Sequence, residues 1–179
     1  MNQNTFGLDR GQWTFLFRSV LFIALYISIQ YSPLFDLSNA KLTELISHSS
    51  RWILNNVYQE NKIIDFWNGR RWVVSNGHSS LHIGSICNGY GLIFLYVGFI
   101  CSTVGVPLLR KLFFAVIGSI SIFIFNVIRI ILLFVLKNQL PGLFDLFHHY
   151  IFQVAVYVLI FTLWYYYLKV YTNSPVSES

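Results

Sequence analysis

Three residues of this sequence have side chains that could do covalent chemistry together: Cys87, Arg129 and His149. A thiol near a positive charge loses its proton more readily, and the thiolate is the nucleophile. A histidine can move protons near neutral pH. An arginine can hold a substrate carboxylate or stabilise a negative oxygen. If the fold brings them together, these residue types predict attack of a thiolate on a carbonyl carbon.

Cys87 stands directly in front of a long apolar run, in "SICNGYGLIFLYVGFI". Gly89 and Gly91 would allow a peptide backbone to approach closely. Backbone N–H groups at the start of the following helix would favour negative charge on the sulfur. Taken alone, Cys87 is typical of a buried structural thiol, and only its combination with Arg129 and His149 favours a nucleophile.

Arg129 lies inside the apolar stretch "IFNVIRIILLFV", with Asn126 three residues earlier on the same helical face. An arginine in lipid costs at least ~2.5 kcal/mol, so it normally faces a bundle interior or a polar cavity. Counting back from Leu136 places it about 10 Å below the membrane boundary, at 1.5 Å per residue. The alternative is an arginine that packs helices together and bonds to backbone carbonyls.

The stretch "DLFHHYIFQVAVY" places Asp145, His149 and Gln153 four residues apart, so we expect them to form one helical stripe. Gln153 is polar within an apolar helix and is expected to face protein, with His149 beside it. His148 is rotated by about 100° and is expected to point elsewhere. Asp145, one turn before His149, could orient its ring. The alternative is a pair of hydrated histidines at the membrane interface.

The composition indicates a chain that lies in a membrane. It has 179 residues, of which 55% are hydrophobic and only 11% charged, whereas soluble domains are about 25% charged. The net charge of +5 comes from scattered basic residues. We therefore expect lipid, and not nucleic acid, as a partner. Two cysteines are too few for a disulfide framework.

Four segments are predicted to cross the membrane as helices, each near the ~20 residues that a crossing needs: 13–31, 90–106, 112–136 and 150–168. The first lacks a small-residue cleavage site and is interpreted as an anchor. The predicted fold class is an all-α integral membrane protein with one domain, 1–179. Residues 170–179 are expected to form a disordered tail.

A long polar insertion, 32–88, separates the first two predicted crossings. Residues 37–57 have helical spacing and are amphipathic, which suits a helix on the membrane surface. Within residues 63–86, the stretch "RRWVVSNGHSSLHIGSI" alternates loosely around Asn76-Gly77, a hairpin signal that predicts a short β-ribbon there. Basic residues near the other connections favour a cytoplasmic amino terminus. On this multi-pass topology in the cytoplasmic (inner) membrane, the insertion, Cys87, Arg129 and His149 all lie toward the extracytoplasmic face.

Three motifs in this region resemble the exosortase/archaeosortase family of multi-pass membrane cysteine transpeptidases. They are "CNGYG" at Cys87, "NVIR" ending at Arg129 and "FHHYIFQ" around His148 and His149. The motifs occur in family order, and the resemblance extends over residues 83–164. The chain has fewer predicted membrane segments than the longer members, so it resembles a compact variant.

The resemblance implies that the chain cleaves carboxy-terminal sorting signals of exported proteins and passes the product to a surface acceptor molecule, without a cofactor. It implies that Cys87 and Arg129 are catalytic, together with one histidine of the pair His148 and His149; the stripe argument favours His149. Expected supporting or substrate-binding residues are Asn88, Gly89, Asn126, Asp145 and Gln153. Water as acceptor would give a protease and an amine would give a transpeptidase, and both stay open.

Two rival interpretations use the same residues differently. A transporter or membrane assembly component would use Arg129 as a binding charge and would need no thiol. A metal site could use His78 and His82, four residues apart, with Cys87, if the segment were helical. The glycines of "NGHSSLHIG" favour a turn or strand there. No metal site is therefore expected.

Overall fold

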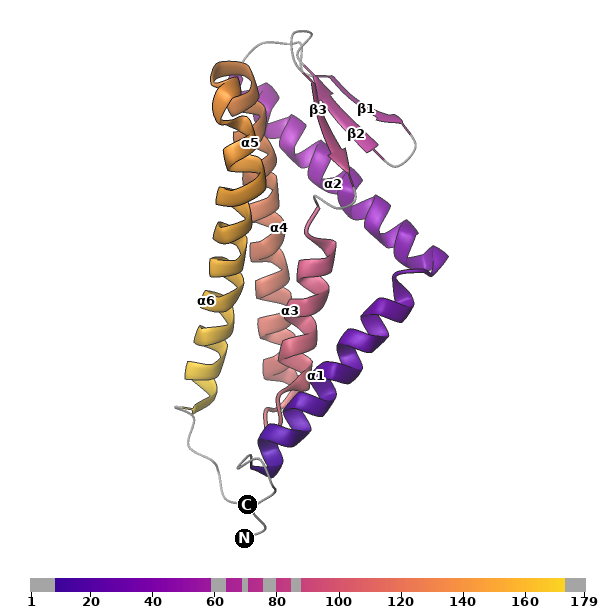
Figure 1. Ribbon diagram of the computed structural model, residues 1–179, viewed down its shortest axis with the longest axis vertical. Helices are drawn as coiled ribbons and strands as arrows, with labels where there is room; N and C mark the ends of the chain where they lie inside the picture. Colours follow the sequence, from indigo (N-terminus) through magenta and orange to yellow (C-terminus); the bar gives the residue numbers. More distant parts are fainter. Residues whose placement is uncertain (1–8, 59–63, 69–70, 76–79, 85–87, 173–179) are drawn as a thin grey trace.

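The structure is a computed structural model, and it describes residues 9–58, 64–68, 71–75, 80–84 and 88–172. Figure 1 shows a long bundle in which α1 rises from the lower end and α2 slants across the upper half beside a small sheet. α3 then descends, α4 rises past it, and α6 returns to the lower end. The elements are α1 (Arg10–Ile29), α2 (Pro33–Tyr58), β1 (Ile64–Asn68), β2 (Arg71–Ser75), β3 (Ser80–Gly84), α3 (Tyr90–Ser102), α4 (Leu108–Gln139), η2 (Pro141–Leu143), α5 (Phe144–Leu146), η3 (Phe147–Ile151) and α6 (Phe152–Thr172).

Among the described residues, three helical segments are long and apolar enough to cross a membrane: Arg10–Ile29, Leu108–Gln139 and Pro141–Val170. They match the first, third and fourth predicted crossings. The second, predicted at 90–106, is an apolar helix of 13 residues, because α3 ends at Ser102. At 1.5 Å per residue it is about 20 Å long, shorter than the ~30 Å hydrocarbon core. The prediction of four crossings is therefore not confirmed.

The carboxyl end of α3 is held by a side chain of the next helix, α4. Thr103 has extended backbone geometry and ends the helix. The ammonium group of Lys111 donates hydrogen bonds to the carbonyl oxygens of Cys101 (3.1 Å) and Thr103 (2.5 Å). These bonds satisfy carbonyls that a helix end leaves without partners. They also tie α3 to the first turn of α4, so the two helices are held antiparallel by a tight connection.

The predicted amphipathic helix at 37–57 is present within α2. Its inward face buries Ile46 and Leu54 against α4 and the sheet, whereas Leu45 and Trp52 are exposed on the opposite face. The inward face also buries three hydroxyl side chains: Thr43, Ser47 and Ser50. A helix that lay flat on lipid would turn only apolar side chains toward the lipid. The buried hydroxyls therefore indicate that this face of α2 packs against protein.

The β-ribbon predicted around Asn76-Gly77 is present as β2 and β3, which pair antiparallel from Arg71↔Gly84 to Ser75↔Ser80. Residues 76–79 themselves lie outside the described residues. A third strand, β1, pairs with β2 and was not predicted. In β3 the side chains of Leu81 and Ile83 are buried and His82 between them is exposed, as strand alternation requires. The helix that a His78–His82 metal site would need is absent at His82.

The interior consists of two apolar clusters stacked along α4. The upper cluster joins α2, the sheet, α4 and the start of α6: Ile46, Leu54, Val74, Leu81, Ile83, Val127, Ile130, Leu133, Phe134 and Phe152. The lower cluster joins α3, α4 and α6: Tyr96, Ile100, Val106, Ile122 and Tyr167. Asn126 lies on α4 between Ile122 and Val127, where the two clusters meet. Arg129 follows three residues after Asn126 on α4, so both polar side chains lie near this junction.

Candidate active site

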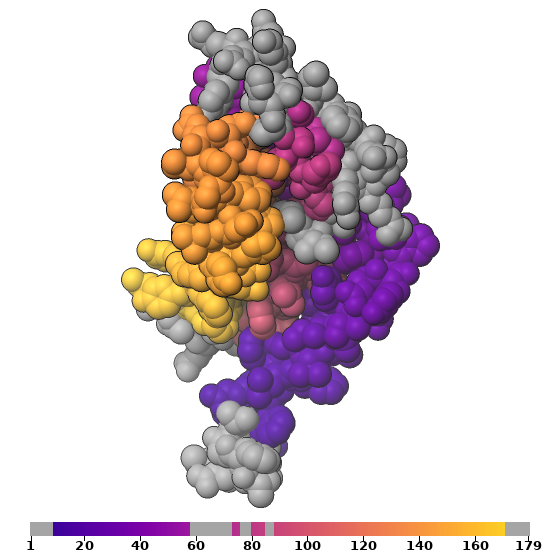
Figure 2. All heavy atoms as spheres, turned by 45° about the horizontal axis from the view of Figure 1, so that its top comes forward, coloured from indigo at the N-terminus to yellow at the C-terminus, as the bar shows by residue number. Residues whose placement is uncertain are grey.

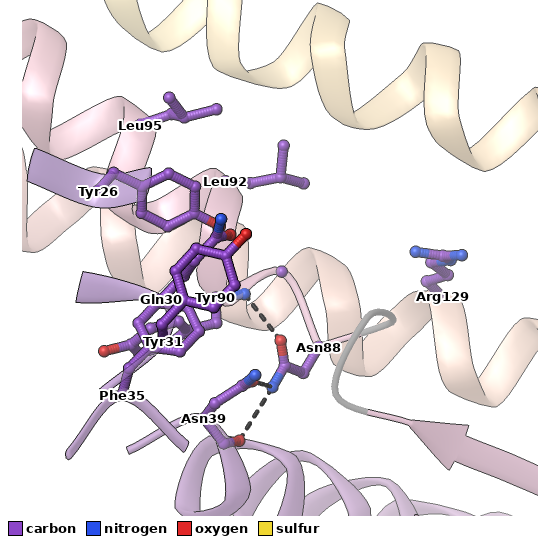
Figure 3. Close-up of a pocket in the computed structure, with 12 residues that line it drawn as sticks. Tyr26, Gln30, Tyr31, Phe35, Asn39, Asn88, Tyr90, Leu92, Leu95 and Arg129 are labelled. Carbon is purple, nitrogen blue, oxygen red and sulfur yellow. Dashed lines mark hydrogen bonds between the residues drawn. The ribbon is translucent and has the colours of Figure 1, made fainter. Parts of the chain in front are cut away.

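A pocket of about 530 Å³ opens beside this junction, between the α1–α2 corner, the start of α3 and α4. Figure 3 shows Asn88 on the turn that leads into α3 and Arg129 on α4, and both line the pocket. The α1–α2 side of the pocket is largely aromatic. Phe35 packs edge-on against Tyr90 with ring centroids 4.8 Å apart. The lining residues are Tyr26, Gln30, Tyr31, Phe35, Asn39, Asn88, Gly89, Tyr90, Gly91, Leu92, Leu95 and Arg129.

Figure 2 shows that α3 is reached from the outside between α5–α6, in orange, and α1–α2, in purple. Rose-coloured atoms of α3 are visible at the base of this gap. The residues that line the pocket come from segments far apart in sequence. The pocket therefore depends on how α1, α2 and α4 pack around the start of α3.

The turn before α3 requires glycine at position 89. Its φ of 74° lies in the left-handed region that side chains with a Cβ rarely adopt. A Cβ placed there would lie 2.2 Å from Nδ2 of Asn126. Gly89 therefore lets the backbone pass directly over the amide of Asn126, and the turn at the start of α3 is pressed onto the polar junction of α4.

Asn88 joins this turn to α2. Its side chain is 1% exposed. Its Oδ1 accepts a hydrogen bond from the N–H of Tyr90 (2.9 Å), which caps the start of α3. Its Nδ2 donates to the backbone oxygen of Asn39 (3.0 Å), to Oδ1 of Asn39, and to Oγ1 of Thr43 (2.8 Å). One buried amide thus binds the start of α3 and the inward face of α2 at the same time.

Two buried polar atoms of α4 have no hydrogen-bond partner among the described residues: Oδ1 of Asn126 and Nε of Arg129. The Nδ2 of Asn126 is used, since it donates to the carbonyl oxygen of Ile122 (2.9 Å). A buried polar group without a partner costs about 1–3 kcal/mol. Arg129 lines the pocket with its Nε–H donor unpaired among the described residues, which is the arrangement expected of a side chain that binds a ligand or substrate.

The histidine pair lies in a π-helical turn, η3, between α5 and α6. The ring of His148 is half-buried and stacks on Phe144, with centroids 5.5 Å apart. It lies within electrostatic range of the Arg129 guanidinium. His149 is exposed, and its Nε2 is 3.5 Å from Nδ1 of His148. The charge of Arg129 therefore acts on the ring of His148, and His149 lies beside that ring.

The predicted inward stripe on the last helix is wrong by one residue. Asp145, His149 and Gln153 are all exposed. The residues that face inward are His148, which is half-buried, and Phe152 and Val156, which are buried. Burying Phe152 removes far more apolar surface from its surroundings than burying Gln153 would, and the wider π-turn separates Asp145 from the regular α-helical spacing that follows.

Cys87 lies outside the described residues. Asn88, the next residue in the chain, lines the same pocket as Arg129. Of the other predicted site residues, Gly89 also lines the pocket, Asn126 lies against it, and Asp145 and Gln153 do not line it. Sequence analysis missed Asn39 and Thr43. Their signal was their spacing of four on the face of α2 that also carries Ser47, a polar stripe on an inward face.

The comparison with protein families gives one extensive match. Residues 5–166 match the family described as transmembrane exosortase (Exosortase_EpsH), well beyond the 83–164 segment that carries the motif resemblance. Neither a search of curated proteins nor a search of solved structures gives a match. The matched residues cover almost all of the three helical segments that are long and apolar enough to cross a membrane. With this match over most of its length, the chain is a multi-pass membrane protein that belongs to the transmembrane exosortase family.

Proposed function

We propose that this chain is a membrane-embedded cysteine peptidase or transpeptidase that cleaves carboxy-terminal sorting signals of exported proteins. Family membership supports a sorting role. The observation that carries the proposal is the pocket shared by Arg129 and Asn88, the residue next to Cys87, with His148 in electrostatic range of the arginine. The half-buried cation Arg129 and the turn after a cysteine thus share one pocket, and a proton carrier, His148, interacts electrostatically with that cation.

In the first half of the reaction, the thiolate of Cys87 attacks the scissile carbonyl carbon. A C–S bond forms, and the carbonyl π electrons move to oxygen, where the Arg129 guanidinium stabilises the negative charge. The tetrahedral intermediate collapses and the C–N bond breaks. Protonated His148 gives its proton to the leaving amine. The product is a thioester on Cys87 and a released carboxy-terminal segment.

In the second half, neutral His148 takes a proton from the incoming nucleophile as it attacks the thioester carbonyl. The C–S bond breaks and the thiolate is restored. Water gives a free carboxylate, and an amine gives a new amide on a surface acceptor. The site is proposed to face the extracytoplasmic side, where exported proteins and surface acceptors are found. No cofactor takes part in either half.

Of the two histidines, we assign the proton transfer to His148. Its ring is half-buried on the inward stripe with Phe152 and Val156, whereas His149 is exposed. His149 lies at 3.5 Å from His148 and can exchange protons between that ring and the surroundings. Asp145 is exposed next to the pair and supports it only at a distance.

The test is a cellular processing assay in which the chain is co-expressed with an epitope-tagged exported protein that carries a carboxy-terminal sorting signal. Cys87→Ala and Cys87→Ser are expected to abolish the shortened product while the chain stays in the membrane fraction. Cys101→Ser is the matched control, because Cys101 is an exposed thiol at the other end of α3, and it should leave processing unchanged. Unaltered processing by Cys87→Ala would overturn the proposal.

The same assay separates the enzyme from a transporter that uses Arg129 as a binding charge. A transporter would respond to Arg129→Ala and ignore Cys87→Ala. The enzyme must respond to both. A substrate protein that accumulates uncleaved with both variants, Arg129→Ala and Cys87→Ala, favours the enzyme.

A further inference from the structure

We propose that Asn39 and Thr43 of α2 are positioning residues for the reaction: acting through Asn88, they hold the turn that follows Cys87 at the Arg129 pocket. This inference rests on the proposed function, because it concerns how the nucleophile is placed. It gives α2 a part in placing the nucleophile, in addition to its packing against the upper apolar cluster. The name Asn88 clamp is used below for the three side chains Asn39, Thr43 and Asn88.

The hydrogen bonds of the Asn88 clamp fix the orientation of the central amide. The hydroxyl of Thr43 donates to the backbone oxygen of Asn39 (2.8 Å), so its lone pairs are left for Nδ2 of Asn88. On the other side of the amide, Oδ1 of Asn88 accepts from the N–H of Tyr90. Rotating the amide by 180° would place an oxygen against the three acceptors Asn39 O, Asn39 Oδ1 and Thr43 Oγ1, and an NH₂ group against the N–H donor of Tyr90. Only one orientation satisfies the clamp.

The clamp is enclosed and spans two elements. Asn88 and Thr43 are each 1% exposed, so water cannot replace the bonds between them without opening the structure. Asn39 also lines the pocket that contains Arg129. On the opposite side of the turn, Gly89 presses on Asn126 of α4. The segment directly after Cys87 is therefore held between α2 and α4, and α2 supplies the directional bonds.

The pocket explains why this placement matters for the thiol. Among the described residues that line the pocket, Arg129 carries the charge. A thiolate gains from that charge only while its turn stays in place, since a shift of ~1 Å in a reacting group can lower a rate by about 100-fold. The Asn88 clamp is thus predicted to affect the ionisation of Cys87 and the turnover number, with little effect on substrate affinity.

The inward face of α2 offers a matched control. Ser47 and Ser50 are fully buried beside Thr43, and their hydroxyl groups have no hydrogen-bond partner among the described residues. Removing the hydroxyl of Ser47 changes the packing of the same helix face without touching Asn88. A general loosening of α2 would show in Ser47→Ala, whereas loss of the clamp would show only in Thr43→Val.

The experiment measures the rate at which iodoacetamide alkylates Cys87 as a function of pH, in the full-length chain in detergent micelles, with Cys101→Ser as the background. Peptide mass spectrometry reports the alkylated fraction of Cys87. In the parent chain, the midpoint is expected below the ordinary thiol pKa of about 8.5. Thr43→Val should raise this midpoint and lower the kcat of processing by about 10-fold to 100-fold, with KM nearly unchanged. Thr43→Ser, which keeps the hydroxyl, should restore both.

Three results would overturn the inference. The first is a Thr43→Val midpoint and kcat equal to those of the parent chain. The second is an equal change in Ser47→Ala, and the third is failure of Thr43→Ser to restore the parent values. If Thr43→Val does not yield a monodisperse protein, Asn39→Ala, at a half-buried position, takes its place with the same expected results. The proposed function fails separately, when Cys87→Ala still processes substrate.

Discussion

Arg129 combines two properties that rarely occur together in a membrane helix. It lies within the long apolar helix α4, and its Nε is buried without a hydrogen-bond partner among the described residues. Arginine is a planar donor with a fixed geometry, whereas lysine is a point charge on a flexible stem. This difference allows the charge of Arg129 to be tested separately from its hydrogen-bonding shape.

Arg129→Ala is expected to lower the kcat of processing by about 100-fold to 1,000-fold, the range seen when an oxyanion donor is removed. Arg129→Lys keeps the charge and should retain more activity than Arg129→Ala while staying well below the parent chain. The measurement is the initial rate of processing by purified chain in micelles. Parent-level rates in Arg129→Ala would show that the guanidinium has no part in the chemistry.

The two histidines are distinguished by position and not by residue type. His148→Ala is expected to lower the processing rate by about 100-fold or more, as for loss of a general acid–base group. His149→Ala is the matched control, an identical substitution one residue away, and should cost less than about 10-fold. Single-turnover assays of both variants make the comparison. A larger loss in His149→Ala would return the catalytic role to His149.

At the residue scale, the sequence supported a good part of the candidate site. Asn88, Gly89 and Arg129 were predicted together from a motif and from an arginine in an apolar helix, and they line one pocket. The helical stripe favoured His149 over His148, because the sequence did not reveal the π-turn or that Phe152, and not Gln153, is buried. A helical stripe assumes regular spacing, and nothing local in "FHHYI" announces the wider turn.

At the element scale, close approach between helices replaces the apolar driving force that lipid weakens. The clearest case is the contact of α3 with α4. A Cβ at Gly118 of α4 would lie 2.1 Å from Cε1 of Tyr96, whose hydroxyl donates to the carbonyl oxygen of Phe114 (3.1 Å). The ring of Tyr96 is attached to α3 at one end and hydrogen-bonded to α4 at the other, so moving it aside would cost free energy.

Gly118→Ala is therefore expected to destabilise the chain by about 1–3 kcal/mol, the usual cost of overpacking. Gly11→Ala in α1 is the control, because a Cβ there meets no described atom within 4 Å, and alanine is the better helix former by about 1 kcal/mol. Thermal unfolding in micelles compares the two. An unfolding temperature of Gly118→Ala at or above the parent value would show that α3 and α4 are not in close contact.

The helices could be predicted from apolar runs of the right length, and the strands from the hairpin signal at Asn76-Gly77. The short length of α3 could not, because the apolar run continues to Val106 while the helix stops at Ser102. The last carbonyls are bonded by Lys111 from the next helix, a tertiary contact that the apolar run does not reveal. β1 was missed because its partner β2 stabilises it, and its own sequence carries little alternation.

At the scale of the whole molecule, the ends of α4 and α6 that flank the histidines lie together at the upper end, and the starts of α1 and α4 lie at the lower end (Figure 1). The proposed orientation puts the upper end outside. In a Cys87→Ser, Cys101→Ser background, Leu140→Cys and Leu109→Cys each place a thiol at an exposed position, one near each end of α4. Intact cells treated with a membrane-impermeant maleimide should label Leu140→Cys and leave Leu109→Cys unlabelled until they are lysed. The reverse pattern would place the site on the cytoplasmic side.

The most direct measurement of the central claim is the covalent intermediate itself. Purified parent chain is mixed with a substrate peptide, quenched in acid at short times and analysed by intact-mass and peptide mass spectrometry. The account predicts an added mass equal to the amino-terminal fragment of the peptide, attached to Cys87, released by hydroxylamine and missing in Cys87→Ala. Cleavage of the peptide at the parent rate by Cys87→Ala, or an adduct on another residue, would contradict it.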